Sequence, residues 1–300
     1  MSAAAPPATP ATPVPAPVPV TFTARDGCRL AGLLLEARAA RGLISLNGAA
    51  GYPHEFYLRF AGYCAERGYH SLVYDYRGCG ASLRGPLRSD PATMAEWARL
   101  DMPAALDFLM QRFAGLPLVT VGHSLGGQLG PAMPNQARAR AHVMLAASIG
   151  YWRLEPAPFR YAAAFFWWVY GPLTLKLLGY VPHSPIWRGE SLPAGVFRQW
   201  RTWCTRPQHF GPDLATELAG NQFAECAAPL LVWAFTDDPI ANPVTVPLLL
   251  EFYRRARIEQ RWTAPRDLGV RHIGHRGFFS PRHRQTLWRE ALDWIDARCD

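Results

Sequence analysis

The stretch V-T-V-G-H-S-L-G-G-Q-L-G (residues 119–130) places Ser124 between two glycines, each two residues away. A G-x-S-x-G string is typical of proteins that use a serine hydroxyl as a nucleophile. The same string also arises by chance in a chain that contains 25 glycines. The residues around it therefore decide whether Ser124 is a candidate nucleophile or an ordinary turn residue.

An apolar strand is predicted immediately before Ser124, over L-P-L-V-T-V-G (116–122), and the segment after the serine can begin a helix. The serine would then lie in the sharp strand-to-helix turn that exposes a nucleophilic hydroxyl. Such a turn strains the backbone at the serine and leaves no room for a Cβ two residues to either side, a requirement that Gly122 and Gly126 meet. The alternative is a glycine-rich turn around an inert serine.

The rest of the chain alternates between predicted strands and helices, which indicates an α/β fold. A turn at Asp26-Gly27 separates the first two strands. The predicted strands are 20–25, 29–36, 42–48, 70–76, 116–122, 141–148 and 229–235. The predicted helices are 54–67, one from Asp90-Pro91 that restarts at 101–103 and runs to about 113, and one over about 281–298.

A nucleophilic serine needs a neighbouring base, and the base needs an orienting carboxylate. Two aspartates follow the strand at 229–235, and two histidines lie in the glycine-marked loop before the last helix. We favour Asp238, which precedes a small turn, over Asp237, which could brace the loop. We favour His275, in the short G-H-R-G sequence, over His272. His123 adjoins the serine and is expected to be structural, because neighbours on such a turn point apart.

The chemistry also requires two backbone N–H groups that bind an oxyanion. The turn supplies one N–H, from Leu125, and the loop N-G-A-A-G-Y (47–52) is placed to supply the other from Ala49. A metal site at His272, His275 and His283 is disfavoured, because no carboxylate lies at a matching helical spacing. We therefore predict no metal and no cofactor.

These segments together resemble the α/β-hydrolase superfamily, and in particular its branch of serine aminopeptidases and monoacylglycerol-lipase-like esterases. The resemblance covers roughly residues 20–148 and 227–298. Asn47 departs from the pattern, since the family usually has histidine there. The motifs that carry the resemblance are N-G-A-A-G-Y (47–52), Y-D-Y-R-G-C-G-A-S (74–82), G-H-S-L-G-G (122–127), D-D-P-I (237–240) and G-H-R-G (274–277).

The resemblance implies an eight-stranded, mostly parallel sheet flanked by helices. It also implies a catalytic triad of Ser124, His275 and Asp238, with Ala49 and Leu125 as the oxyanion donors. The superfamily contains acyltransferases, haloperoxidases and inactive binding proteins as well as hydrolases, so the motifs specify the fold more narrowly than the substrate.

Three regions are predicted: a proline- and alanine-rich disordered tail (1–19), a hydrolase core (20–148 and 227–300) and a helical, aromatic-rich cap (149–226). The cap sequence 159–180 is dense in aromatic residues and interrupted by a glycine-proline pair. Its longest uncharged run is too short to span a membrane, although an apolar cap face could contact a membrane surface weakly. We expect Phe165, Trp168 and Tyr52 to bind the substrate.

Composition narrows the function further. The net charge of +8 comes almost entirely from scattered arginines, which disfavours nucleic-acid binding. The six cysteines show no metal or disulfide spacing, which favours a reduced, cytoplasmic protein.

We predict a serine hydrolase that cleaves small-molecule esters with an apolar acyl or aromatic group. The alternatives are a peptidase or acyltransferase on the same triad, or a silent hydrolase fold that binds a hydrophobic ligand. No acidic cluster for a substrate amino group is evident near the cap.

Overall fold

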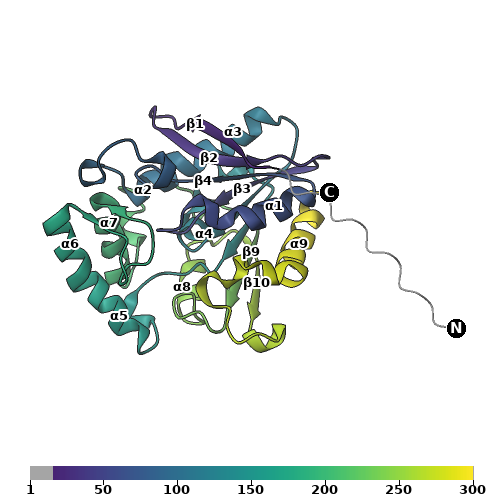
Figure 1. Cartoon of the computed structure of the whole chain (residues 1–300). Helices are drawn as coiled ribbons and strands as arrows, with labels where there is room; N and C mark the ends of the chain where they lie inside the picture. Colours follow the sequence, from purple (N-terminus) through teal and green to yellow (C-terminus); the bar gives the residue numbers. More distant parts are fainter. Residues whose placement is uncertain (1–15, 300) are drawn as a thin grey trace.

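The computed structural model describes residues 16–299 and is built on a sheet of eight strands (Figure 1). The strands lie in the order β1, β2, β4, β3, β5, β6, β9, β10. Strand β2 is antiparallel to β1 and β4, whereas the other neighbours are parallel, so the predicted mostly parallel sheet is confirmed. Their bounds are β1 Val18–Thr23, β2 Arg29–Leu35, β3 Gly42–Asn47, β4 Tyr69–Tyr74, β5 Leu118–His123, β6 Ala141–Leu145, β9 Pro229–Phe235 and β10 Arg257–Thr263.

The central strands are buried along their whole length. Every residue of β3, β4, β5 and β6 is buried, as expected for parallel strands that helices cover on both faces. Helix α1 packs against β4, α3 against β3, β1 and β4, and α4 against β5 and β6. The helices of this layer are α1 Leu58–Glu66, α2 Met94–Glu96, α3 Met102–Arg112, α4 Leu125–Leu129, α8 Thr245–Leu250 and α9 Arg289–Cys299.

Two predicted helix features are wrong. The helix after β4 begins at Met94, not at Asp90-Pro91, because Thr93 and Glu96 form a capping box at its start. It is also not interrupted before Pro103, because a wider π-helical turn over Trp97–Asp101 leads directly into α3. A π-helical turn accommodates the missing N–H of the proline without ending the helix.

The chain between β6 and β9, which we call the insertion (residues 149–226), lies beside the sheet on the left of Figure 1. It contains α5 Phe159–Phe165, α6 Gly171–Leu178 and α7 Ala194–Thr205. It is not entirely helical, because β7 (Tyr180–Val181) and β8 (Leu192–Pro193) form a short antiparallel pair. The helix does not break at Gly171-Pro172 either, since a second π-helical turn over 166–170 joins α5 to α6. The predicted tail falls mostly on residues 1–15, outside the described part of the chain, while residues 18–19 already belong to β1.

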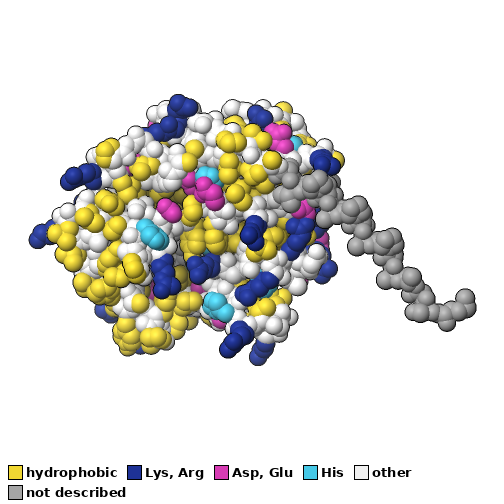
Figure 2. Space-filling view, in the orientation of Figure 1, with side chains coloured by type: hydrophobic (Ala, Val, Ile, Leu, Met, Phe, Trp, Pro, Cys, Tyr) yellow, Lys and Arg dark blue, Asp and Glu magenta, His cyan; other side chains and the backbone are white. Residues whose placement is uncertain are grey.

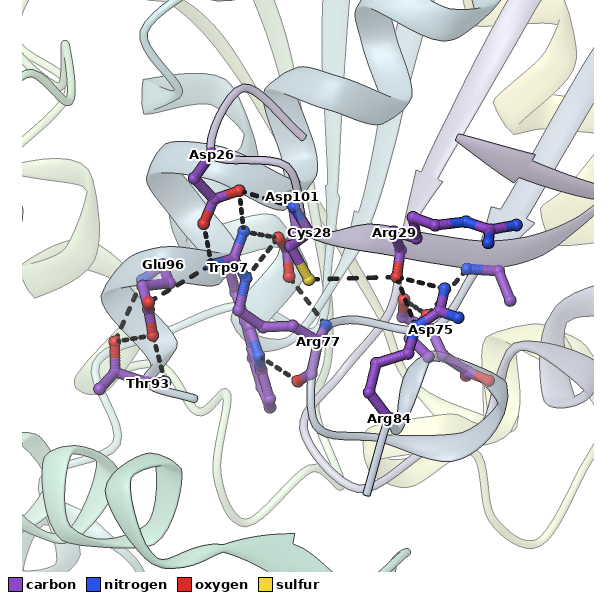
Figure 3. A network of polar contacts seen from close by, with 12 residues as sticks. Asp26, Cys28, Arg29, Asp75, Arg77, Arg84, Thr93, Glu96, Trp97 and Asp101 are labelled. Atoms are coloured by element: carbon purple, nitrogen blue, oxygen red, sulfur yellow. Dashed lines mark hydrogen bonds and ion pairs between the residues drawn. The ribbon is translucent and has the colours of Figure 1, made fainter. Parts of the chain in front are cut away.

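The motif Y-D-Y-R-G-C-G-A-S (74–82) forms a clamp that connects three segments, and Figure 3 shows its contacts with two of them, at Asp26 and at Asp101. The Arg77 guanidinium donates to Asp101 at the start of α3 and to Asp26 in the β1–β2 turn. The Asp75 carboxylate accepts from the backbone N–H of His54 at 2.9 Å and contacts its ring at 2.7 Å. Because His54 lies two residues after the 47–52 loop, this motif positions the loop and takes no direct part in the site described below.

Candidate active site

Ser124 lies in the sharp turn that the glycine spacing predicts. Its backbone has φ 51° and ψ −114°, a left-handed conformation that non-glycine residues rarely adopt. A Cβ on Gly122 would lie 2.5 Å from the Cα of Gly127, and a Cβ on Gly126 would lie 2.7 Å from the carbonyl oxygen of Gly48. The turn can therefore form only with glycine at both positions, and it presents the Ser124 hydroxyl at the end of β5.

The structure brings Ser124, His275 and Asp238 into one hydrogen-bonded line. His275 Nε2 is 2.9 Å from Ser124 Oγ, and His275 Nδ1 is 2.8 Å from Asp238 Oδ2. The Asp238 side chain is fully buried. Burial acts to raise the pKa of Asp238, but the His275 ring and two backbone N–H groups outweigh it, so the pKa lies below its usual value. Asp238 is therefore ionised and holds the Nδ1–H of His275, which leaves Nε2 free to accept the serine proton.

The second aspartate and the second histidine form a separate pair. Asp237 accepts hydrogen bonds from the backbone N–H groups of Ile273 and Gly274 at 2.9 and 3.0 Å. Its carboxylate is also 2.6 Å from Nδ1 of His272, whose ring is largely exposed. Asp237 thus braces the loop that carries His275, which is the role that the sequence suggested for it.

His123 lies in a buried chain of hydrogen bonds behind the serine. Its Nε2 is 2.8 Å from the carbonyl oxygen of His275, and its Nδ1 is 3.0 Å from the Tyr57 hydroxyl. Burial lowers the pKa of His123 to about 3, so the ring is neutral. Because a carbonyl only accepts, Nε2 carries the proton and Nδ1 accepts from Tyr57. His123 is therefore structural, as predicted, and it supports the backbone of His275.

This chain of hydrogen bonds corrects the expectation for Ala49. The Ala49 N–H donates to Tyr57 Oη at 2.8 Å, so this N–H is already engaged inside the protein. The Leu125 N–H is at the first position of α4, where an N–H has no partner within the helix. Of the two predicted oxyanion donors, only Leu125 is thus available in this structure.

A cavity of about 590 Å³ opens beside Ser124 and His275. Tyr52 and Phe165, two of the three residues that we expect to bind the substrate, line it. Trp168 does not line it: its side chain points outward, is 52% exposed and carries the Arg201 guanidinium 4.4 Å from its ring centre. Trp167 occupies the wall in its place, together with residues that were not predicted to bind the substrate: Phe159, Phe166, Ile186, Trp187, Trp200 and Ile240.

The insertion closes this cavity against the 47–52 loop at one close contact. The Glu190 N–H donates to the Gly51 carbonyl at 2.8 Å. A Cβ on Gly51 would overlap the Trp187 ring, and Gly51 also has a left-handed φ of 78°. Two polar side chains of the cavity wall, Gln128 and Glu155, also lacked any sequence signal. The cavity wall also includes the carboxylic side chain of Glu190.

Within residues 16–299, no cluster of His, Cys, Asp and Glu side chains is placed to hold a metal ion. Within the same range, no helix combines the length and apolar character needed to cross a membrane.

Comparisons with known proteins agree with this fold. A family model described as the alpha/beta hydrolase family matches residues 43–285. Among solved structures, a soluble variant of monoglyceride lipase from Saccharomyces cerevisiae, in complex with a substrate analog, superposes with a TM-score of 0.65. The two sequences are 17% identical, and the match covers 96% of this chain and 97% of the lipase.

Two archaeal proteins are similar in fold. An esterase from Pyrococcus furiosus has a TM-score of 0.60 at 14% identity, over 95% of this chain and 92% of its own. A monoacylglycerol lipase from Paleococcus ferrophilus has a TM-score of 0.57 at 16% identity, over 90% of this chain and 99% of its own. No curated protein matches the sequence significantly. The family match extends over most of the chain and includes the turn at Ser124, and the chain therefore belongs to the alpha/beta hydrolase family.

Proposed function

We propose that the protein is a serine hydrolase that cleaves carboxylic esters with an apolar acyl or aromatic group through an acyl-enzyme intermediate. The observation that carries the proposal is the line of hydrogen bonds from Ser124 to His275 to Asp238 at the edge of a cavity of about 590 Å³. The walls of this cavity are mainly aromatic and aliphatic side chains, which suit an apolar group.

In the proposed mechanism, His275 Nε2 takes the proton of the Ser124 hydroxyl while Oγ attacks the ester carbonyl. Asp238 holds the imidazolium that forms, and the Leu125 N–H binds the oxyanion. Ala50 replaces Ala49 as the second donor in our proposal, because its N–H has no partner among the described residues and it lines the same cavity. His275 then protonates the leaving alcohol, and a water molecule activated by His275 releases the acid.

The first experiment is hydrolysis of 4-nitrophenyl esters from acetate to palmitate by the wild type and by Ser124→Ala. We expect turnover by the wild type, with a preferred acyl length that the cavity sets. We expect Ser124→Ala to lower kcat by at least about 1,000-fold. Ser89→Ala is the control, because that hydroxyl lies on an exposed turn and bonds only to Pro86. A Ser124→Ala variant with unchanged turnover would exclude the proposed nucleophile.

The neighbouring aspartates provide a matched pair of variants. Asp238→Asn is expected to lower kcat by about 10,000-fold, because an amide favours the wrong tautomer of the base. Asp237→Asn keeps that contact and perturbs only the supporting loop, so we expect a much smaller loss. Equal losses in the two variants would contradict the assignment of Asp238.

We also propose that the outer face of α5 and α6 contacts an anionic membrane surface weakly. Tyr161, Val169, Leu173 and Leu177 on this face are between 49% and 69% exposed, and Figure 2 shows hydrophobic side chains gathered over these helices. Residues 156–189 contain no acidic side chain but include several basic ones. An apolar face with basic neighbours is suited to a lipid surface of negative charge.

Co-sedimentation with vesicles tests this contact. We expect binding to phosphatidylglycerol vesicles that weakens with salt and is lost in Leu173→Glu/Leu177→Glu. These positions lie outside the cavity wall, so hydrolysis of soluble esters should not change. Binding that does not depend on the two leucines would exclude this face.

A further inference from the structure

The wall of the cavity beside Ser124 carries two arginines that the proposed mechanism does not use. Arg276 follows the base His275 directly, within the 3₁₀ turn over Gly274–Phe279, and lines the cavity. Arg188 lines the same cavity from the insertion. Both arginines are exposed, so a ligand at the mouth of the cavity can contact their guanidinium groups.

The protein itself leaves both guanidinium groups without a counter-charge. Among residues 16–299, no carboxylate lies within ion-pair distance of Arg188 or Arg276. Arg188 Nε donates to the carbonyl oxygen of Pro185 at 3.5 Å, which is a long hydrogen bond. Burial raises the pKa of Tyr52, and the positive charge of Arg276 opposes this rise, so the Arg276 guanidinium lies near the Tyr52 hydroxyl. Arg276 and Tyr52 thus offer neighbouring donors beside the base.

The acidic groups around the cavity do not cancel this positive charge. Glu155 and Glu190 line the wall as well, but burial raises the pKa of Glu155 to about 8, so its carboxyl group is mainly neutral near pH 7. Glu190 also lines a second, small cavity beside Cys79. Asp238 lies behind His275, which shares its charge through a hydrogen bond at 2.8 Å. Even with Glu190 counted as negative, the two arginines leave one excess positive charge among the side chains that line the cavity.

The proposed mechanism indicates which part of the substrate lies beside Arg276. His275 Nε2 must reach the leaving oxygen in order to protonate it, so the alcohol part of the ester lies on the side of His275. The apolar acyl group suits the aromatic wall of the insertion, which includes the buried Trp167. The alcohol part is therefore the part that the next residue, Arg276, can contact. A guanidinium group binds the two oxygens of a carboxylate or phosphate in one plane.

We propose that Arg276, together with the neighbouring Tyr52 hydroxyl, receives an anionic carboxylate or phosphate group on the alcohol part of the substrate. The substrate is then an ester of an apolar acid with an acidic alcohol. This inference rests on the proposed ester hydrolysis, because that reaction supplies the leaving alcohol. Arg276 acts here as a specificity-determining residue and takes no part in proton transfer.

The test compares four octanoyl esters that differ in their alcohol: glycerol, glycerol 3-phosphate, 4-hydroxybutanoate and choline. Released octanoate is measured by chromatography. We expect kcat/KM of the wild type to be about 10-fold or more higher for one of the two anionic esters than for the glycerol ester. The same comparison shows whether the anionic group is a phosphate or a carboxylate. The preference should weaken in about 0.5 M NaCl, because salt screens charges at an exposed site.

Variants of charged residues assign the preference to Arg276. Arg276→Ala should lower the ratio of kcat/KM between the anionic ester and the glycerol ester by about 10-fold. Arg276→Lys should retain part of the ratio, because lysine keeps the charge but not the planar pair of donors. The exposed Arg271→Ala is the matched control, since it removes the same charge from the same loop outside the cavity wall and should leave the ratio unchanged. Glu190→Gln removes the opposing charge and should raise the ratio.

Three results would overturn the proposal. The first is an equal kcat/KM for the anionic esters and the glycerol ester. The second is a preference for the choline ester, which would mean that Glu190 outweighs the arginines. The third is an equal fall of the ratio in Arg276→Ala and Arg271→Ala, which would assign the preference to the overall charge of the protein.

A binding measurement separates this inference from the proposed function. Calorimetry with the wild type compares 1-O-octylglycerol with its 3-phosphate, which are ethers that an esterase does not cleave. We expect the phosphate to bind about 10-fold more tightly, and Arg276→Ala but not Arg271→Ala to remove the difference. If the wild type hydrolyses no ester, the proposed function fails, and the two ethers alone decide whether the anion site exists. Equal binding of the two ethers would overturn the anion site even if esters are hydrolysed.

Discussion

Gly126 gives the most direct test of how the fold positions Ser124. A Cβ introduced by Gly126→Ala would overlap the carbonyl oxygen of Asn47 and lie 2.5 Å from its carbonyl carbon. Since carbon atoms pack at about 3.5 Å, the loop after β3 or the turn at Ser124 must move by about 1 Å. Both segments carry proposed reacting or oxyanion-binding groups, and a displacement of about 1 Å costs about 100-fold in rate. Overpacking should also lower the free energy of unfolding by about 1–3 kcal/mol.

The assay for Gly126→Ala is kcat with the best 4-nitrophenyl ester, measured beside urea unfolding. Gly85→Ala is the matched control, because a Cβ at Gly85 has no atom within 4 Å and the backbone there is not left-handed. The control should leave kcat and the unfolding free energy unchanged. A Gly126→Ala variant with wild-type values of both would refute the reasoning, since it would mean that the turn can absorb a side chain without moving Ser124.

Three further predictions concern buried polar groups. Tyr57→Phe leaves the Ala49 N–H and Nδ1 of His123 without their buried partner, and urea unfolding should show a loss of about 2–4 kcal/mol in the free energy of unfolding. A loss below about 0.5 kcal/mol would contradict the described chain of hydrogen bonds. Burial raises the folded-state pKa of Glu155 from 4.5 to about 8, so the folded protein binds more protons than the unfolded chain in this window and stability falls as pH rises. Between about pH 5.5 and pH 8, Glu155→Gln should therefore gain up to about 3 kcal/mol relative to the wild type, and a constant difference would argue against the raised pKa. The Asp101 side chain is fully buried, and Arg77→Leu removes the positive charge that its carboxylate contacts. This variant should therefore lose about 3–5 kcal/mol in the free energy of unfolding, measured by thermal or urea unfolding. The exposed Arg84→Ala is its control and should be nearly neutral, so similar losses in the two variants would contradict the role of the clamp.

The turn at Ser124 could be predicted because its requirements are local. A strand that reverses into a helix within one residue needs glycine at two fixed positions, whatever surrounds it. The loops of Asp238 and His275 were found for a similar reason, since each follows an apolar strand or precedes a helix that the sequence displays. The choice between Asp237 and Asp238 also followed from local geometry, because successive side chains point in opposite directions.

Features that depend on tertiary contacts were predicted poorly. The expectation for Ala49 missed Tyr57, whose hydroxyl accepts the Ala49 N–H from eight residues further along the chain. The expectation for Trp168 missed the π-helical turn over 166–170, after which Trp167 and not Trp168 lines the cavity. Glu155 could not be found at all, because a single acidic residue in a loop carries no sign that it is buried.

The contact between Gly51 and Trp187 has a consequence for how this protein can be recombined with its relatives. The two residues come from the core and from the insertion, and residue 51 cannot gain a side chain unless the Trp187 ring moves or is replaced by a smaller one. A chimera that receives the insertion of a relative would therefore have a steric mismatch where the insertion meets the 47–52 loop. Exchanging residue 51 together with the insertion would avoid this mismatch. We therefore expect the two positions to vary together among relatives, although they lie 136 residues apart in the chain. We expect substrate range in such chimeras to follow the origin of this pair more closely than the origin of the serine turn.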